Sequence, residues 1–136
     1  MTHGLEAQVK ILIVCSDPTV LKILTIGFQD NGLMFDYVST GEEALRLLGT
    51  SLADYVIIDN NLHDITSLEL ARQIKKLGSC QILLLANFSE LGETLEALDK
   101  FIDDYLLKPF SFEQVMVILK RFRKIDQLRR EISIIN

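Results

Sequence analysis

The sequence has no tryptophan, only two prolines and two cysteines, and few aromatic side chains, which make up 7% of its 136 residues. Two cysteines cannot provide the disulfide framework that holds small secreted domains together. No apolar run approaches the roughly 18 residues that span a bilayer. The 14 basic residues are outnumbered by 19 acidic ones, and the net charge of −5 argues against broad attraction to nucleic acid or anionic lipid.

The first eight residues contain neither the basic flank nor the apolar stretch of a signal peptide. We therefore expect a cytoplasmic protein that binds no membrane. Basic side chains cluster only over residues 120–124 and at Arg129 and Arg130. The negative charges of Asp126 and Glu131 partly offset this positive charge. A solvated helix face explains this cluster more simply than a nucleic-acid site.

What the sequence does have is five short apolar runs at fairly even spacing: Val9–Val14, Met34–Val38, Tyr55–Ile58, Ile82–Leu85 and Tyr105–Leu107. Segments with helical periodicity separate them, which is typical of βα units around a parallel sheet. The chain length suits one domain with a real core. The sequence therefore predicts an α/β fold, a doubly wound (βα)5 sandwich of three layers.

Helix-start signals support this fold. Asp17 precedes Pro18, an N-cap acid followed by a proline suited to the first helical position. A hydroxyl residue followed three positions later by Glu or Gln predicts helices over residues 41–49, 67–77 and 112–131. A less regular helix is predicted from residue 89 to 99, with its leucines facing inward: Leu91, Leu95 and Leu98.

The carboxyl ends of parallel strands meet at one edge of such a sheet, where open α/β folds place their chemistry. Asp59 ends the third run and Lys108 follows the fifth. A carboxylate can act as a nucleophile toward a phosphoryl group, and an ammonium can neutralise phosphoryl oxygens. An ordinary ion pair at the rim of the sheet is the alternative. Other candidates share this edge: Cys15, Ser16, Asp17, Asn61, Ala86 and Asn87.

Three segments, ILIVCSDP at residues 11–18, YVIIDNNLHDITSLEL at 55–70 and DDYLLKPF at 103–110, resemble the receiver domains of bacterial two-component response regulators. The resemblance covers roughly residues 8–124. It implies a flavodoxin-like fold with strand order 2-1-3-4-5, and a cis peptide at Lys108-Pro109. It also implies that Asp59 is the phosphoacceptor, that Lys108 contacts the phosphate, and that Tyr105 and position Ala86 form the switch. We accordingly divide the chain into a receiver domain, 1–124, and a helical extension, 125–136.

The departures from the family concern the phosphate machinery. Receiver domains usually hold Mg²⁺ with two acidic residues after the first strand, and here Cys15 and Ser16 stand in their place. The metal ligands that remain are Asp59, Asn61 and Asp17, although Asp17 is better used as an N-cap. Ala86 stands where the family has a hydroxyl residue that binds a phosphoryl oxygen. We expect Mg²⁺ to bind weakly if at all, no other cofactor, and little or no Mg²⁺-dependent phosphorylation.

The leading hypothesis is therefore an atypical receiver, not an enzyme, that acts through protein–protein contacts. Its partners would be a histidine kinase or an output domain, bound through the face formed by residues 89–99, 105–107 and 112–131. The first alternative is a conventional receiver phosphorylated on Asp59 by a histidine kinase. A small aspartate-nucleophile phosphatase is the second, although Asn61 stands where its general acid belongs. A flavin module would need a glycine-rich loop, which residues 15–18 lack.

Three further features carry weaker hypotheses. His63 could be a phosphoryl carrier or metal ligand, but a lone histidine in a polar loop usually is neither. Cys15 could be a redox sensor at an exposed strand end, although filling the space of the missing acid is the simpler role.

A seam of about two heptads follows the domain at Ile125, Leu128, Ile132 and Ile135. It predicts a linker to an output domain, a homodimerisation helix, or a plain surface helix.

Overall fold

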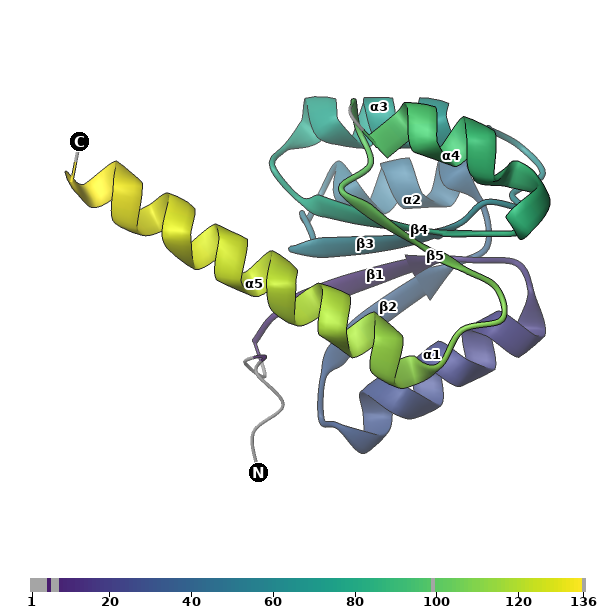
Figure 1. Cartoon of the computed structure of the whole chain (residues 1–136), viewed down its shortest axis with the longest axis horizontal. Helices are drawn as coiled ribbons and strands as arrows, with labels where there is room; N and C mark the ends of the chain where they lie inside the picture. The colour runs from purple at the N-terminus through teal and green to yellow at the C-terminus, as the bar shows by residue number, and fades with distance from the viewer. Residues whose placement is uncertain (1–4, 6–7, 99, 136) are drawn as a thin grey trace.

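The computed structural model describes residues 5, 8–98 and 100–135. In this part of the chain, strands and helices alternate from one end to the other (Figure 1). Their bounds are β1 Lys10–Val14, α1 Pro18–Asp30, β2 Met34–Val38, α2 Gly41–Leu48, β3 Tyr55–Asp59, α3 Ser67–Leu77, β4 Gln81–Ala86, α4 Leu91–Leu98, β5 Asp104–Leu107 and α5 Phe112–Ile135. A short 3-10 turn, Phe88–Glu90, leads into α4.

The strands form one parallel sheet in the order β2-β1-β3-β4-β5, which confirms the predicted (βα)5 topology. In its register Val14 is paired with Ile58, Asp59 with Leu85, and Ala86 with Leu107. The carboxyl ends of β1, β3, β4 and β5 therefore lie along one edge of the sheet.

Helices cover both faces of the sheet, as the three-layer prediction requires (Figure 1), and an apolar layer lies beneath them on each face. Successive β1 residues alternate between them, with Ile11 and Ile13 in the layer under α1 and α5, and Leu12 and Val14 in the layer under α2, α3 and α4. Because β1, β3 and β4 are buried on both faces, these strands are apolar at nearly every position. This explains the continuous apolar runs in the sequence.

The predicted helix caps are present. The Asp17 carboxylate accepts a hydrogen bond from the Thr19 backbone N–H at 2.9 Å, so that this acid caps α1. Hydroxyl groups cap three other helices, in the pairs Thr40 with Glu43, Thr66 with Glu69, and Ser111 with Gln114. Local signals in the sequence therefore mark the helix starts.

The predicted inward face of the fourth helix is wrong at one position. Leu95 is 49% exposed, whereas Thr94 is only 2% exposed. Spacings of three and four residues both fit a helix, so either Thr94 or Leu95 could lie on the buried side between Leu91 and Leu98. After its 3-10 entry, α4 buries Thr94. The predicted end of this helix, residue 99, lies outside the described residues.

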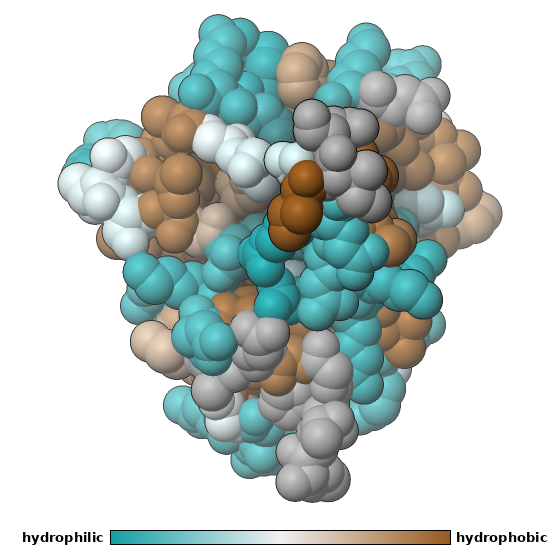
Figure 2. Space-filling model, turned by 90° about the vertical axis from the view of Figure 1, so that its left-hand side faces the viewer, coloured by the Kyte–Doolittle hydropathy of each residue, from teal (hydrophilic) through white to brown (hydrophobic). Residues whose placement is uncertain are grey.

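The last helix continues through the predicted helical extension, and its final turns extend beyond the sheet (Figure 1). Leu119 and Phe122 are buried against the core, but Ile125, Leu128 and Ile132 are 40%, 48% and 57% exposed. Figure 2 views the molecule from this end and shows apolar residues set among hydrophilic ones. No helix among the described residues is long and apolar enough to cross a membrane.

A polar cluster anchors α5 at the beginning of this extension. The Asp126 carboxylate accepts hydrogen bonds from the Gln81 amide at 2.7 Å and from the Tyr55 hydroxyl at 3.4 Å. Gln81 also donates to the Phe122 carbonyl at 2.9 Å. The helix is thus tied to the amino ends of β3 and β4, and we name its residues 124–135 the α5 tail.

Candidate functional site

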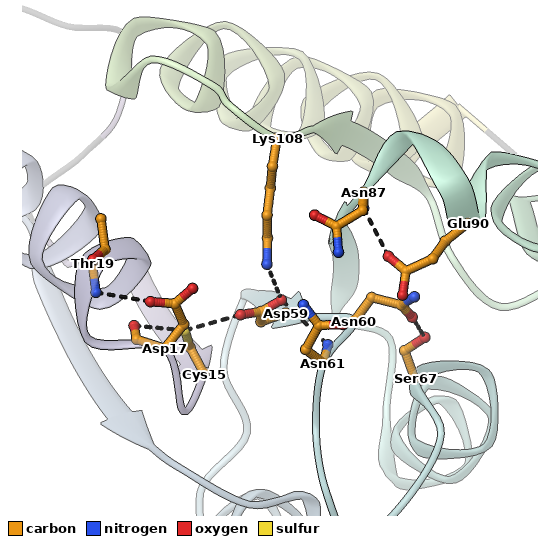
Figure 3. A network of polar contacts seen from close by, with 10 residues as sticks. All are labelled: Cys15, Asp17, Thr19, Asp59, Asn60, Asn61, Ser67, Asn87, Glu90 and Lys108. Atoms are coloured by element: carbon orange, nitrogen blue, oxygen red, sulfur yellow. Dashed lines mark hydrogen bonds and ion pairs between the residues drawn. The ribbon is translucent and has the colours of Figure 1, made fainter.

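Asp59 is the last residue of β3 and is 1% exposed. The Lys108 ammonium lies 2.6 Å from its Oδ1, and the Asn61 backbone N–H donates to the same oxygen at 3.3 Å. The Cys15 thiol donates to Oδ2 at 3.4 Å. Figure 3 shows these groups converging on one carboxylate. The structure thus brings together Asp59 and Lys108, which the sequence analysis singled out.

Lys108 reaches this carboxylate from the loop after β5. Its backbone N–H donates to the Ala86 carbonyl at 2.8 Å, and its side chain is 14% exposed. The peptide bond between Lys108 and Pro109 is cis, as the resemblance implied. The neighbouring strand β4 therefore fixes the backbone from which the ammonium extends.

Cys15 is buried, with 1% exposure, and this corrects the expectation of an exposed strand end. Burial raises the pKa of its thiol to about 12, and the negative charge of Asp59 adds to the rise although a hydrogen bond to the Asp17 carbonyl opposes it. The thiol is therefore protonated at neutral pH. Because the thiolate is the reactive form, the structure argues against Cys15 as a redox sensor.

The described residues beside Asp59 offer few charged oxygen ligands for a metal ion. Asp17 uses its carboxylate to cap α1, and Ser16 supplies a neutral hydroxyl. Among the described residues no group of three His, Cys, Asp or Glu side chains is placed to bind a metal ion. Mg²⁺ needs near-octahedral oxygen ligands and favours carboxylates. One ion-paired carboxylate, a thiol and a hydroxyl therefore fit Mg²⁺ poorly.

The switch positions lie on β4 and β5. Ala86, fully buried at the end of β4, carries no hydroxyl that could bind a phosphoryl oxygen. Tyr105 is partly buried and packs against the apolar layer under α2, α3 and α4. Asn87 follows Ala86, and its backbone N–H donates to the Glu90 carboxylate at 2.7 Å.

The loop after β3 contains contacts that the sequence analysis missed. The Ser67 hydroxyl bonds to the Asn60 side-chain oxygen (Figure 3). The Asp64 carboxylate accepts from the backbone N–H groups of Gly41 and Glu42, at 3.1 and 3.0 Å, which lowers its pKa. An acid that caps the N-terminus of a neighbouring helix can be recognised in a sequence. Here the capped helix, α2, is distant from Asp64 in the sequence, so this contact was not predicted.

Comparison with known proteins agrees with this architecture. Residues 11–120 match the model of the response regulator receiver domain. The chain belongs to this family. Over 113 residues the receiver is 32% identical to the response regulator MprA of Mycolicibacterium vanbaalenii, an alignment that covers 82% of this chain and 49% of that protein. The receiver thus spans about half the length of such curated relatives.

Solved structures show the same fold. A two-component response regulator from Clostridium difficile superposes with a TM-score of 0.80 and 26% identity, covering 86% of this receiver and 97% of that chain. The BeF3-activated DrrB receiver domain superposes with a TM-score of 0.75 and 29% identity, covering 85% and 97%. The flavodoxin-like receiver fold predicted from the sequence is therefore confirmed.

Proposed function

We propose that this receiver signals through protein–protein contacts, with little or no Mg²⁺-dependent phosphorylation of Asp59. Receiver domains of response regulators are generally signalling modules and not enzymes. The observation that carries the proposal is the surroundings of the Asp59 carboxylate, which pairs with Lys108 and has a neutral Cys15 thiol where an acid is expected. Lys108 and the thiol occupy both carboxylate oxygens without providing ligands for a divalent cation.

Electrostatics makes an acyl phosphate at Asp59 unfavourable. A phosphoryl group adds nearly two negative charges, and Lys108 offers one positive charge. A unit charge left uncompensated at about 4 Å corresponds to about 4 kcal/mol at an effective dielectric constant of 20. In phosphoryl transfer Mg²⁺ normally neutralises this excess. With so few oxygen donors here, we expect phosphorylation to be disfavoured by several orders of magnitude.

A second argument concerns the response to phosphorylation. The alanine at position 86 cannot donate a hydrogen bond to a phosphoryl oxygen. Such a bond would draw β4 and then Tyr105 into a second arrangement. Even a phosphorylated Asp59 would therefore change the populations of the two states only weakly.

We propose that the partner is a histidine kinase or an output domain, bound through α4, β5 and α5. This face carries large exposed apolar side chains, with Leu95 at 49% and Val117 at 56% exposure. Phe88, just before α4, is 74% exposed. Apolar side chains gathered on one face mark interaction surfaces. A homodimer through the same face is the other arrangement that this surface would allow.

The test is titration with beryllofluoride and Mg²⁺, followed by NMR shifts of Asp59, Ala86 and Tyr105. We expect no saturable shift in the wild-type receiver. The triple variant Cys15→Asp/Ser16→Asp/Ala86→Thr restores the missing groups and should shift saturably, which makes it the positive control. Saturable shifts in the wild type would support the conventional receiver phosphorylated on Asp59. Turnover of an aryl phosphate would support the phosphatase hypothesis instead.

A further inference from the structure

A groove of about 640 Å³ lies between the β3–α3 loop, the start of α3, and α4. Its lining includes four apolar side chains: Leu62, Ile65, Leu68 and Leu84. Its volume falls in the range of about 300–1,000 Å³ that is usual for binding pockets. The groove is separate from the Asp59 carboxylate and has no role in the mechanism proposed above.

Acidic side chains surround this apolar lining. Glu90, Glu93 and Glu96 lie along the α3-facing side of the 3-10 turn and α4, and Asp64 lies opposite. Glu93 and Glu96 are both exposed. The basic groups that line the groove are Lys100 and the imidazole of His63. An occupant that is both apolar and positively charged is therefore favoured.

The α5 tail has this chemistry. Leu128 and Ile132 are 48% and 57% exposed and lie one helical turn apart. Lys124 and Arg129 are exposed and flank this apolar stripe on its two sides. Residues 120–131 contain six basic and two acidic side chains in a chain that is acidic overall. Nothing in the described part of the chain covers the exposed stripe.

Pairing of two such tails with each other is less favourable. In a parallel pair with Ile125, Leu128 and Ile132 at the core, Lys124 of one helix would oppose Arg129 of the other, a contact between like charges. The seam also spans only about two heptads, fewer than the three or four of a confident coiled coil. An acidic surface is a better complement to this helix than a second basic helix.

The tail cannot reach the groove of its own chain. Figure 1 shows the end of α5 beyond the amino ends of the strands, whereas the β3–α3 loop and the start of α4 lie at their carboxyl ends. The Asp126 anchor to Gln81 and Tyr55 holds the helix in this direction. Only a tail from another molecule is available to the groove.

We propose that the α5 tail of a second copy of this chain docks into the groove between α3 and α4. Leu128 and Ile132 contact the apolar lining, while Lys124 and Arg129 pair with Glu93 and Glu96. Each copy then offers one groove and one tail, so the contact is head-to-tail and can propagate from copy to copy. It requires neither Mg²⁺ nor phosphorylation.

Sedimentation velocity of the purified protein without Mg²⁺ tests this assembly. The wild type should associate reversibly, and rising salt should weaken the association. We expect Glu93→Lys/Glu96→Lys and Lys124→Glu/Arg129→Glu each to raise the dissociation constant at least about tenfold. The charge-matched surface controls Asp30→Lys/Asp36→Lys and Lys22→Glu/Lys76→Glu should associate as the wild type does.

Mixing the two interface variants gives the decisive result. The groove variant keeps an intact tail and the tail variant keeps an intact groove, and their reversed charges complement each other, so the mixture should assemble as the wild type does although neither variant assembles alone. Tail-to-tail pairing predicts instead that the groove variant by itself associates as strongly as the wild type. That outcome, or a wild type that stays monomeric up to about 1 mM, would overturn the proposal. Neither outcome bears on the phosphorylation of Asp59, which the beryllofluoride titration tests separately.

Discussion

The Lys108 ammonium lies 2.6 Å from the Asp59 carboxylate, and the two side chains differ in how far they are buried, with 14% and 1% exposure. Removing the cation leaves a carboxylate that cannot reach water. Removing the anion leaves a long, flexible cation that can turn toward water. The two halves of this ion pair therefore make unequal contributions to stability.

We predict that Lys108→Met lowers the free energy of unfolding by about 2–4 kcal/mol, whereas Asp59→Asn lowers it by about 1 kcal/mol or less. Urea unfolding measures both free-energy changes, provided that the m-value stays unchanged. The double variant Asp59→Asn/Lys108→Met should recover part of the loss of Lys108→Met, because it removes the unpaired charge. A greater loss for Asp59→Asn than for Lys108→Met would contradict this account.

The Cys15 thiol should be almost inert in the folded protein. Burial raises its pKa from 9.0 to about 12, so at pH 8 the thiolate fraction is about a thousandfold below that of an exposed thiol. In a Cys80→Ala background, which isolates Cys15, we expect alkylation at pH 8 to be slower than in urea by at least that factor. The rate should rise with pH toward 12. Mass spectrometry after timed quenching measures it, and rapid labelling at pH 7 would restore the redox hypothesis.

The same pKa shift implies a pH dependence of stability. A group whose pKa is raised on folding contributes stability that is fully present below its unfolded pKa, near 9, and that is lost as pH rises through its folded pKa. Comparison of wild type with Cys15→Ala by urea unfolding should therefore show a difference that changes between pH 9 and 12. A difference that is constant over this interval would mean that the thiol does not keep its proton on folding.

Much of the architecture could be predicted because it depends on local signals. The apolar runs identified the strands, and Thr40, Thr66 and Asp17 marked helix starts that the structure confirms. Asp59 and Lys108 could be paired in advance because parallel strands end at one edge of the sheet, whatever their side chains. These inferences need only the hydrophobic periodicity of each segment and the order of the strands in the sheet.

The features that escaped prediction depend on packing between elements distant in the sequence. Leu95 and Thr94 both satisfy a helical pattern, and only the docking of α4 decides which is buried. The exposure of Cys15 depends on how closely Asp59 and the α1 entry approach it. The Asp126 anchor joins residues that are 45 and 71 positions apart in the sequence. Neither the hydrophobic periodicity of a segment nor the order of the strands indicates contacts of this kind.

Restoring the acid pair should create a Mg²⁺ dependence. In Cys15→Asp/Ser16→Asp, the new carboxylates repel Asp59 and lower stability without metal. Mg²⁺ that binds only the folded state should then raise the free energy of unfolding by about 1–2 kcal/mol at about 10 mM, for a dissociation constant near 1 mM. Thermal unfolding over a Mg²⁺ series measures this.

Two controls separate charge from shape in that experiment. Cys15→Asn/Ser16→Asn introduces side chains of the same size without charge, and its stability should not respond to Mg²⁺. The wild-type receiver should respond equally little. A wild-type response as large as that of the acidic variant would show that Asp59 with Asp17 and Asn61 suffices to bind Mg²⁺, and would remove the main support for an atypical receiver.

The contact between α1 and α5 gives a matched pair of glycine substitutions. A Cβ at Gly27 would overlap the ring of Phe112, which packs edge-on against Phe28 with centroids 5.2 Å apart. A Cβ at Gly92 in α4 would meet nothing within 4 Å. Gly27→Ala should therefore destabilise by about 1–3 kcal/mol through overpacking. Gly92→Ala should stabilise by up to about 1 kcal/mol, because alanine has the higher helix propensity.

Urea unfolding of the two variants measures this difference, and a second substitution identifies its cause. Phe112→Leu removes the ring that the new methyl group would meet, so Gly27→Ala should cost much less in that background than in the wild type. The coupling between positions 27 and 112 should exceed about 0.5 kcal/mol, which is the usual size for residues in contact. If the two substitutions were simply additive, α1 and α5 would not approach as closely as the structure shows, and the packing that directs the α5 tail would need another explanation.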